Sequence, residues 1–285
     1  MQGKYLVNRK RYYYSFVSGY SKADSFKLVS FSDKIYIAGE KFQAKEDEGM
    51  EKANNAMLKF MKTTLWFSYK YNWASYIEDT KLNNDVGWGC MIRCGQMLMA
   101  SAVLKKTGMR SEEMRSQYIG LCSDNNTGDL APFGIHNIVK YAAKKYNITP
   151  GQWFRGTTIM MSLDGLNNHY KPPLTHDIRI FTSVDSLVNI TEIYKKVFSI
   201  QKVPEGVNPL EELKTKDWGV SLLFCVAIRT GLNKPQANFK KSLARLMELK
   251  QSVGFLGGKD HKAYYIVGRP DFIEATMMQK RNITI

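Results

Sequence analysis

The sequence is poor in the residues that build disulfide frameworks and metal sites. Its 285 residues include only four cysteines and four histidines. The two nearest cysteines, Cys90 and Cys94, form a C-x-x-x-C pair rather than C-x-x-C, and no second pair or nearby histidine completes a tetrahedral site. This argues against a disulfide-stapled secreted scaffold. We therefore expect free thiols, a cytoplasmic location, no metal and no cofactor.

Long apolar runs and acidic residues are also scarce. No stretch approaches the eighteen or so consecutive apolar residues of a membrane-spanning helix, and Met1–Tyr13 is too polar for a signal peptide. Lys and Arg number 41 against 26 Asp and Glu, which gives a formal net charge of +15. Such a surplus favours an anionic partner: nucleic acid, an anionic membrane surface or an acidic protein face.

Apolar residues make up 44% of the chain, which is enough for a folded core. Residues 1–32 are expected to form a basic, aromatic extension, in which Arg9–Arg11 run into Tyr12–Tyr14. Basic residues interleaved with aromatics can bind RNA. No recognisable nucleic-acid module follows, however, so we favour a solvated arm and expect no nucleic-acid partner.

Hydrophobic periodicity predicts helices early and strands late, without strict alternation, which indicates an α+β fold. The nearly continuous apolar run at Val220–Ile228 predicts a central strand covered on both faces. Predicted helices cover Glu46–Tyr71, a stretch from Cys90 onward, Ile135–Lys145, Thr191–Ile200 and Phe239–Lys250; predicted strands cover Lys34–Ala38, Ile178–Phe181 and Ala263–Val267; predicted loops or turns cover Leu163–Pro173, Gln201–Asp217 and Gly257–Gly258.

The most informative stretch is Asp85–Met97, in which Gly87 and Gly89 permit a tight turn just before Cys90. Cys90 then begins a long apolar helix, where unpaired backbone N–H groups and the helix dipole favour negative charge. A thiol in that position is biased toward the reactive thiolate, and Arg93 adds a positive charge one turn later. The alternative is that Cys90 is a small core residue, as free cysteines commonly are.

The remaining cysteines are interpreted as structural. Cys94 lies one turn after Cys90 within the apolar stripe, Cys225 lies inside a predicted buried strand, and Cys122 lies near a loop.

The segment Gly87–Met97 closely resembles the nucleophile segment of the autophagins, the autophagy-related cysteine proteases. Four further segments agree in order with the family and extend the resemblance over about residues 33–268: Leu65–Tyr69 (similar to an upstream helix), Ile135-His136, Gly151–Trp153, and Leu256–Lys259 followed by Ala263–Gly268. This resemblance favours the nucleophile reading of Cys90.

The resemblance implies a papain-like fold over residues 33–268. It implies cleavage of a ubiquitin-like autophagy modifier after its C-terminal glycine and release of that modifier from phosphatidylethanolamine. By position, Cys90 matches the nucleophile, Tyr69 the tyrosine of the oxyanion hole and Trp153 a lid over the substrate's glycine, while Lys259–Lys262 match a gating loop. A monomer in transient contact with the membrane that carries the conjugate is expected.

The sequence departs from the family at its catalytic base. A cysteine protease of this type needs an imidazole and an orienting acid, which the family takes from an Asp-Pro-His that these 285 residues lack. His261, with Asp260 or Asp271 as its acid, is the possible substitute base. His136 is read as a packing or hydrogen-bonding residue, and His169 and His176 as solvated residues in or beside a Pro-rich loop.

Residues 269–285 are therefore interpreted as a divergent tail, and the domain as incomplete and lacking the family's C-terminal strands. A truncated or misread gene model, a natural pseudoenzyme and a rebuilt site all explain this, and the first is favoured because the divergence is abrupt. The expected function is a cysteine endopeptidase of autophagy that is impaired in this chain. The alternative is a non-catalytic binding module for the same modifier.

Overall fold

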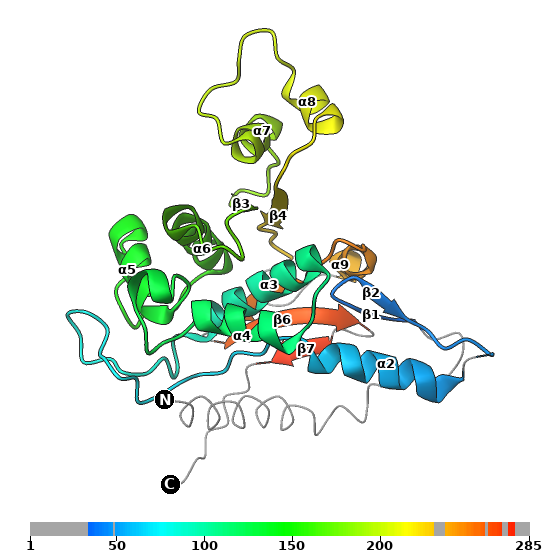
Figure 1. Cartoon of the computed structure of the whole chain (residues 1–285), viewed down its shortest axis with the longest axis horizontal. Helices are drawn as coiled ribbons and strands as arrows, with labels where there is room; N and C mark the ends of the chain where they lie inside the picture. Colours follow the sequence, from blue (N-terminus) through cyan, green and yellow to red (C-terminus); the bar gives the residue numbers. More distant parts are fainter. Residues whose placement is uncertain (1–33, 48, 231–236, 260–261, 270–272, 277–285) are drawn as a thin grey trace.

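The computed structural model describes residues 34–47, 49–230, 237–259, 262–269 and 273–276 (Figure 1). The predicted α+β class is confirmed. In chain order the elements are β1 (Ile35–Ile37), β2 (Glu40–Phe42), α2 (Met50–Lys62), α3 (Cys90–Thr107), α4 (Glu112–Leu121), the 3-10 turn η2 (Gly128–Leu130), α5 (Ile135–Tyr146), α6 (Gly156–Tyr170), β3 (Ile178–Ser183), α7 (Ile190–Phe198), α8 (Pro209–Thr215), β4 (Ser221–Val226), α9 (Ala237–Glu248), β5 (Phe255–Lys259), β6 (Lys262–Arg269) and β7 (Ile273–Thr276).

The main sheet is antiparallel and centres on β6, which pairs with β1, β5 and β7, while β2 extends the sheet beyond β1. Helix α3 packs on β5 and β6. The hydroxyl of Tyr265 in β6 donates to Ser101 Oγ of α3 at 2.7 Å, and both residues are buried. The late strands therefore form the platform for the helix that Cys90 begins.

Helix α3 is largely buried, in keeping with the long apolar helix predicted from Cys90 onward. Nearly all its side chains are buried, from Cys90 and Met91 through Leu104. It lies against α6 so closely that a Cβ on Gly95 would come within 2.4 Å of Ile159 Cγ1. Such packing holds the start of α3 at a fixed place in the fold.

A second region, the β3–β4 arm (residues 178–226), projects away from the main sheet (Figure 1). It consists of β3 and β4, which pair in parallel, and the connecting helices α7 and α8. The prediction that Val220–Ile228 is a central, doubly covered strand is wrong. Phe224 is 43% exposed and Val226 36% exposed, because β4 belongs to a two-stranded sheet.

The long helix predicted over Glu46–Tyr71 is also wrong in its extent, because α2 ends at Lys62. The hydroxyl of Thr63 donates to the carbonyl of Phe60 at 2.7 Å, and the Thr63 N–H donates to the same oxygen. These bonds close the last turn of α2. The Leu65–Tyr69 segment, expected to resemble a helix, follows α2 and has no regular secondary structure.

The loop predicted over Leu163–Pro173 is mostly helix, since α6 continues to Tyr170. Leu163 and Leu166 are buried, and the Asn167 amide donates to the carbonyls of Thr175 and Ile178 at 3.0 and 2.9 Å. Asn167 thus connects the helix end to the approach of β3, where a loop had been expected.

Two further predictions also fail. The Gln201–Asp217 loop contains α8, which Asn208 caps by accepting from Leu210 N–H at 3.1 Å, with Pro209 at its first position. Gly257 and Gly258 are not a turn but lie within β5, opposite Tyr264 and Ala263. Besides α6, α8 and β5, the elements β2, α4, η2 and β7 had no counterpart in the prediction.

The 1–32 extension lies outside the described residues, as does most of the 269–285 tail. The domain boundaries therefore stay predictions. Within the described part of the chain, no helix is both long enough and apolar enough to cross a membrane.

Candidate active site

Cys90 is the first residue of α3 and is only 1% exposed. The chain enters the helix through a turn in which Gly89 N–H donates to the carbonyl of Asp85 at 2.9 Å, and Gly87 has a φ of 86°. Gly89 has no room for a side chain, because a Cβ there would lie 2.4 Å from the Cβ of Asp85. The two glycines do what the sequence predicted: Gly87 turns the chain, and Gly89 allows close approach.

Trp153 lies directly on the sulfur of Cys90. Its indole N–H donates to Cys90 Sγ at 3.2 Å, across 63 residues of sequence. The end of β5 joins them: a methyl group at Gly258 would lie 3.1 Å from Trp153 Cζ2 and 3.2 Å from Met91 Cε. The structure therefore brings Cys90, Trp153 and the strand that leads to the predicted gating segment together.

Lys259 is the last residue of β5, and its backbone pairs with Lys262 of β6. Lys259 therefore directly follows Gly258, the residue that lies against Trp153. His261 and Asp260, proposed as substitute base and acid, lie outside the described residues, as does Asp271.

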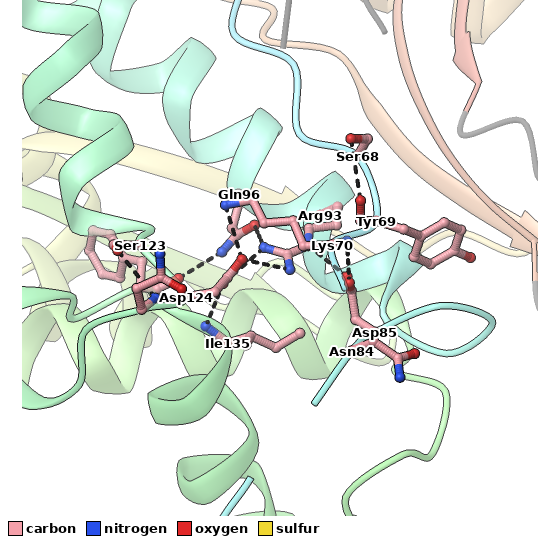
Figure 2. A network of polar contacts seen from close by, with 12 residues as sticks. Ser68, Tyr69, Lys70, Asn84, Asp85, Arg93, Gln96, Ser123, Asp124 and Ile135 are labelled. Atoms are coloured by element: carbon pink, nitrogen blue, oxygen red, sulfur yellow. Dashed lines mark hydrogen bonds and ion pairs between the residues drawn. The ribbon is translucent and has the colours of Figure 1, made fainter. Parts of the chain in front are cut away.

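Tyr69 is the second residue of the predicted set that contacts Cys90. Burial raises the pKa of Tyr69 far above its ordinary value, and a side-chain hydrogen bond with Cys90 raises it further. The phenol therefore keeps its proton at neutral pH and is available as a hydrogen-bond donor beside the sulfur. The Tyr69 ring points away from the polar network described next, as Figure 2 shows.

A buried network of charges lies beneath these residues (Figure 2). Arg93, which is 0% exposed, donates through Nε to Asp85 at 2.7 Å and through its two terminal nitrogens to Asp124 at 3.1 and 2.9 Å. Lys70 adds a second cation, its Nζ lying 3.0 Å from Asp124. Two cations thus pair with two carboxylates. Arg93 also donates to Gln96 Oε1 at 3.2 Å.

The pKa values of this network follow from the pairing. Burial would raise the pKa of Asp124, but Arg93 and Lys70 outweigh it and lower the pKa to about 2. Burial would likewise lower the pKa of Arg93, yet the Asp124 and Asp85 carboxylates hold it above its ordinary value. Arg93 thus keeps its positive charge, and that charge is paired with the Asp85 and Asp124 carboxylates.

The network was missed because it joins distant segments. Asp124 lies 31 residues after Arg93, and its Oδ1 also accepts from Ile135 N–H at 3.3 Å. The one available signal was Arg93 itself, together with Gln96, on an otherwise apolar helix. A fully buried arginine requires carboxylate partners.

Three of the four histidines lie in the described part of the chain. His136 packs on Trp73 with ring centroids 5.3 Å apart, and burial lowers its pKa, so its reading as a packing residue is confirmed. His169 is in the last turn of α6, about 20 Å along the helix from the end beside Met91. His176 bonds the Pro173 carbonyl through Nδ1 at 2.8 Å.

The other three thiols are affected by burial. Burial raises the pKa of Cys94 well above its ordinary value, and raises those of Cys122 and Cys225 to about 12. These groups stay protonated thiols at neutral pH, which fits their predicted structural roles. All four cysteines are free, and no cluster of His, Cys, Asp or Glu in the described residues is arranged to hold a metal.

A cleft of about 520 Å³ opens on the side of Trp153 that the start of α6 lines. Its lining mixes aromatic, apolar and polar side chains: Tyr146, Ile148, Gln152, Trp153, Arg155, Thr158 and Met161. Trp153, which lines this cleft, also donates to the sulfur of Cys90, whereas Cys90 is not among the lining residues.

Comparison with known proteins relates the chain to a family of peptidases. The model of the peptidase C54 catalytic domain matches residues 54–273. A probable cysteine protease ATG4 of Scheffersomyces stipitis is 30% identical over 214 residues, which are 74% of this chain and 37% of that protein. Cysteine protease ATG4A of Bos taurus is 25% identical, over 82% of this chain and 61% of that protein.

A third relative, cysteine protease ATG4b of Arabidopsis thaliana, is 26% identical over 85% of this chain and 53% of its own length. The chain thus spans between about a third and three fifths of the relatives it matches.

Proposed function

Because the chain belongs to the peptidase C54 family, we propose that it is a cysteine endopeptidase of autophagy with Cys90 as its nucleophile. The observation that carries this is the meeting of Trp153 and Tyr69 on one sulfur at the start of a buried helix. The sulfur would attack the scissile carbonyl carbon, forming a C–S bond while the carbonyl π electrons move to oxygen. Tyr69, still protonated, would donate a hydrogen bond to that oxyanion.

The geometry also favours a substrate with a small residue at the cleavage site. Cys90 is 1% exposed and Trp153 donates to its sulfur, so the indole must shift before a carbonyl reaches the thiol. Gly258 and Met91 border the same space. A residue without a side chain fits such a passage best, and we take the substrate to be a ubiquitin-like autophagy modifier that ends in glycine. Trp153 and the β5–β6 segment with Lys259 would form the gate.

The same residues would cleave the precursor and release the modifier from phosphatidylethanolamine, since both reactions attack the carbonyl of the terminal glycine. This would bring the protein into transient contact with the membrane that carries the conjugate. We also propose that the protein is a cytoplasmic monomer and that its protease domain covers residues 33–268.

These 285 residues contain no Asp-Pro-His. A thiol without an oriented imidazole loses its general base, so the residues present here are expected to bind the modifier and cleave it slowly. If His261 replaces the missing base, cleavage is fast and depends on that imidazole. If nothing replaces it, the chain is a binding module for the modifier, which is the second candidate function.

The test separates binding from cleavage. Purified chain, with Cys90→Ala and His261→Ala variants, is incubated with the modifier precursor, and titration calorimetry with the mature modifier runs in parallel. We expect binding by all three forms and slow cleavage that Cys90→Ala abolishes. Fast cleavage lost in His261→Ala would identify the substitute base. No binding by any form would contradict both candidate functions.

A further inference from the structure

The segment that carries Tyr69 has no helix or strand of its own to hold it. What holds it is a reciprocal pair of bonds with Asp85. The N–H of Lys70, the next residue, donates to Asp85 Oδ1 at 2.6 Å, and Asp85 N–H donates to the Lys70 carbonyl at 3.2 Å. Figure 2 shows Asp85 between this segment and the guanidinium of Arg93.

Asp85 also determines the approach to Cys90. Its second oxygen accepts from Arg93 Nε at 2.7 Å, its carbonyl accepts from Gly89 N–H at 2.9 Å, and its side chain packs where a Cβ of Gly89 would lie. One fully buried carboxylate therefore contacts both the residue after Tyr69 and the residue before Cys90.

The far side of the network keeps Asp85 in place. Arg93 is held at its other end by both oxygens of Asp124, and Asp124 is held by Ile135 N–H and by Lys70 Nζ. Charge-assisted bonds of this kind, shielded from water, have defined geometry and resist rearrangement. A shift of Asp85 would break bonds on both sides.

We propose that Asp85 is the positioning residue that holds the Tyr69 hydroxyl against the Cys90 sulfur. It does not touch substrate; it sets where the oxyanion donor stands relative to the nucleophile. The inference rests on the proposed function, in which Tyr69 stabilises the oxyanion. A misplacement of about 1 Å at such a site costs roughly a hundredfold in rate.

The test measures a covalent adduct that needs no general base. The probe is the modifier with its terminal glycine as an aldehyde: Cys90 sulfur adds to the aldehyde carbon, the C=O π bond opens, and the thiol proton ends on oxygen. Tyr69 would donate to that oxygen. The modifier with an ordinary glycine carboxylate cannot form the bond and reports binding alone. Loss of aldehyde binding in Cys90→Ala verifies that the adduct forms at Cys90.

The variants are Asp85→Asn, Tyr69→Phe and both together, with Lys140→Met as the control. Lys140→Met removes an exposed ion pair with Glu78 that lies outside the network. We expect each of the first two to weaken aldehyde binding about tenfold, and the double variant to be no weaker, because both act through one hydroxyl. Carboxylate binding should be unchanged throughout, and Lys140→Met close to wild type.

Two results would overturn the proposal: wild-type aldehyde binding by folded Asp85→Asn, or a double variant weakened about a hundredfold, which would mean independent action. A structural role alone would weaken carboxylate binding equally.

If Asp85→Asn does not fold, hydrogen exchange of the wild type decides: the Lys70 amide should exchange at least about tenfold more slowly than an open loop amide. Loop-like exchange there would also overturn the proposal. Failure of wild type to form any adduct would instead contradict the proposed function.

Discussion

The body around α3 and the β3–β4 arm use polar groups in opposite ways. In the body, Arg93, Asp85 and Asp124 are buried and paired with one another. In the arm, ion pairs such as Lys214–Glu211 are 58% exposed on both sides, and Phe224 also faces solvent. Buried charge fixes geometry and is costly to disturb, whereas exposed pairs contribute little. The candidate active site lies in the region where geometry is fixed.

The largest expected effect is the removal of the buried cation. Arg93→Met leaves the Asp85 and Asp124 carboxylates buried and under-compensated, so the free energy of unfolding should fall by about 3–5 kcal/mol in urea denaturation. Lys214→Met in the arm is the control and should change it by less than about 0.5 kcal/mol. Equal losses in the two variants would abolish the contrast between body and arm.

The second prediction contrasts a buried and an exposed side chain within the β3–β4 arm. Ile180 of β3 is 2% exposed, and β3 packs on α6, whereas Phe224 is 43% exposed. Ile180→Ala should destabilise the protein by about 2–4 kcal/mol. Phe224→Ala should lower the free energy of unfolding by only about 1 kcal/mol, mainly through its lost stacking on Phe181. A larger loss in Phe224→Ala than in Ile180→Ala would mean that the exposed face of the arm is covered in solution.

A third effect is the pH dependence of the body. The folded pKa of Asp124, about 2, lies below its unfolded value near 3.9, so its contribution is present above about pH 4 and is lost as the pH falls toward 2. The loss amounts to roughly 2 kcal/mol. Urea denaturation at pH 5 and pH 2.5 should show this loss in the wild type and a smaller one in Asp124→Asn. An equal loss in Asp124→Asn and in the wild type would contradict the assignment.

Hydrophobic periodicity predicted the helices whose apolar side chains are buried in the core. The helices from Cys90 and from Ile135 were predicted because apolar residues recur at helical spacing. Periodicity does not tell what covers an apolar run, and so Val220–Ile228 was assigned to the centre of a sheet that in fact has two strands. The Asn-Asn-His of α6 was read as a loop because polar residues favour turns. Tertiary bonds of Asn167 outweigh that preference.

The residues of the candidate site were predicted, whereas the buried charged network beside them was not. Cys90 was named from its place at a helix start and from the family resemblance, and Tyr69 and Trp153 from the resemblance alone. The structure brings the three together. Asp85 was read only as part of a turn, and Asp124 was not noticed. Their roles depend on pairings between segments far apart in sequence, which leave no periodic pattern along the chain.

The central claim is that Cys90 is a reactive thiol under a movable indole, and native-state alkylation tests it most directly. Iodoacetamide labelling at neutral pH, mapped by mass spectrometry, should modify Cys90 faster than Cys94, Cys122 or Cys225, even though Cys225 is the most exposed of the four. Trp153→Ala should accelerate the labelling of Cys90 alone. Modification of Cys90 only after unfolding, or labelling led by Cys225, would contradict the claim.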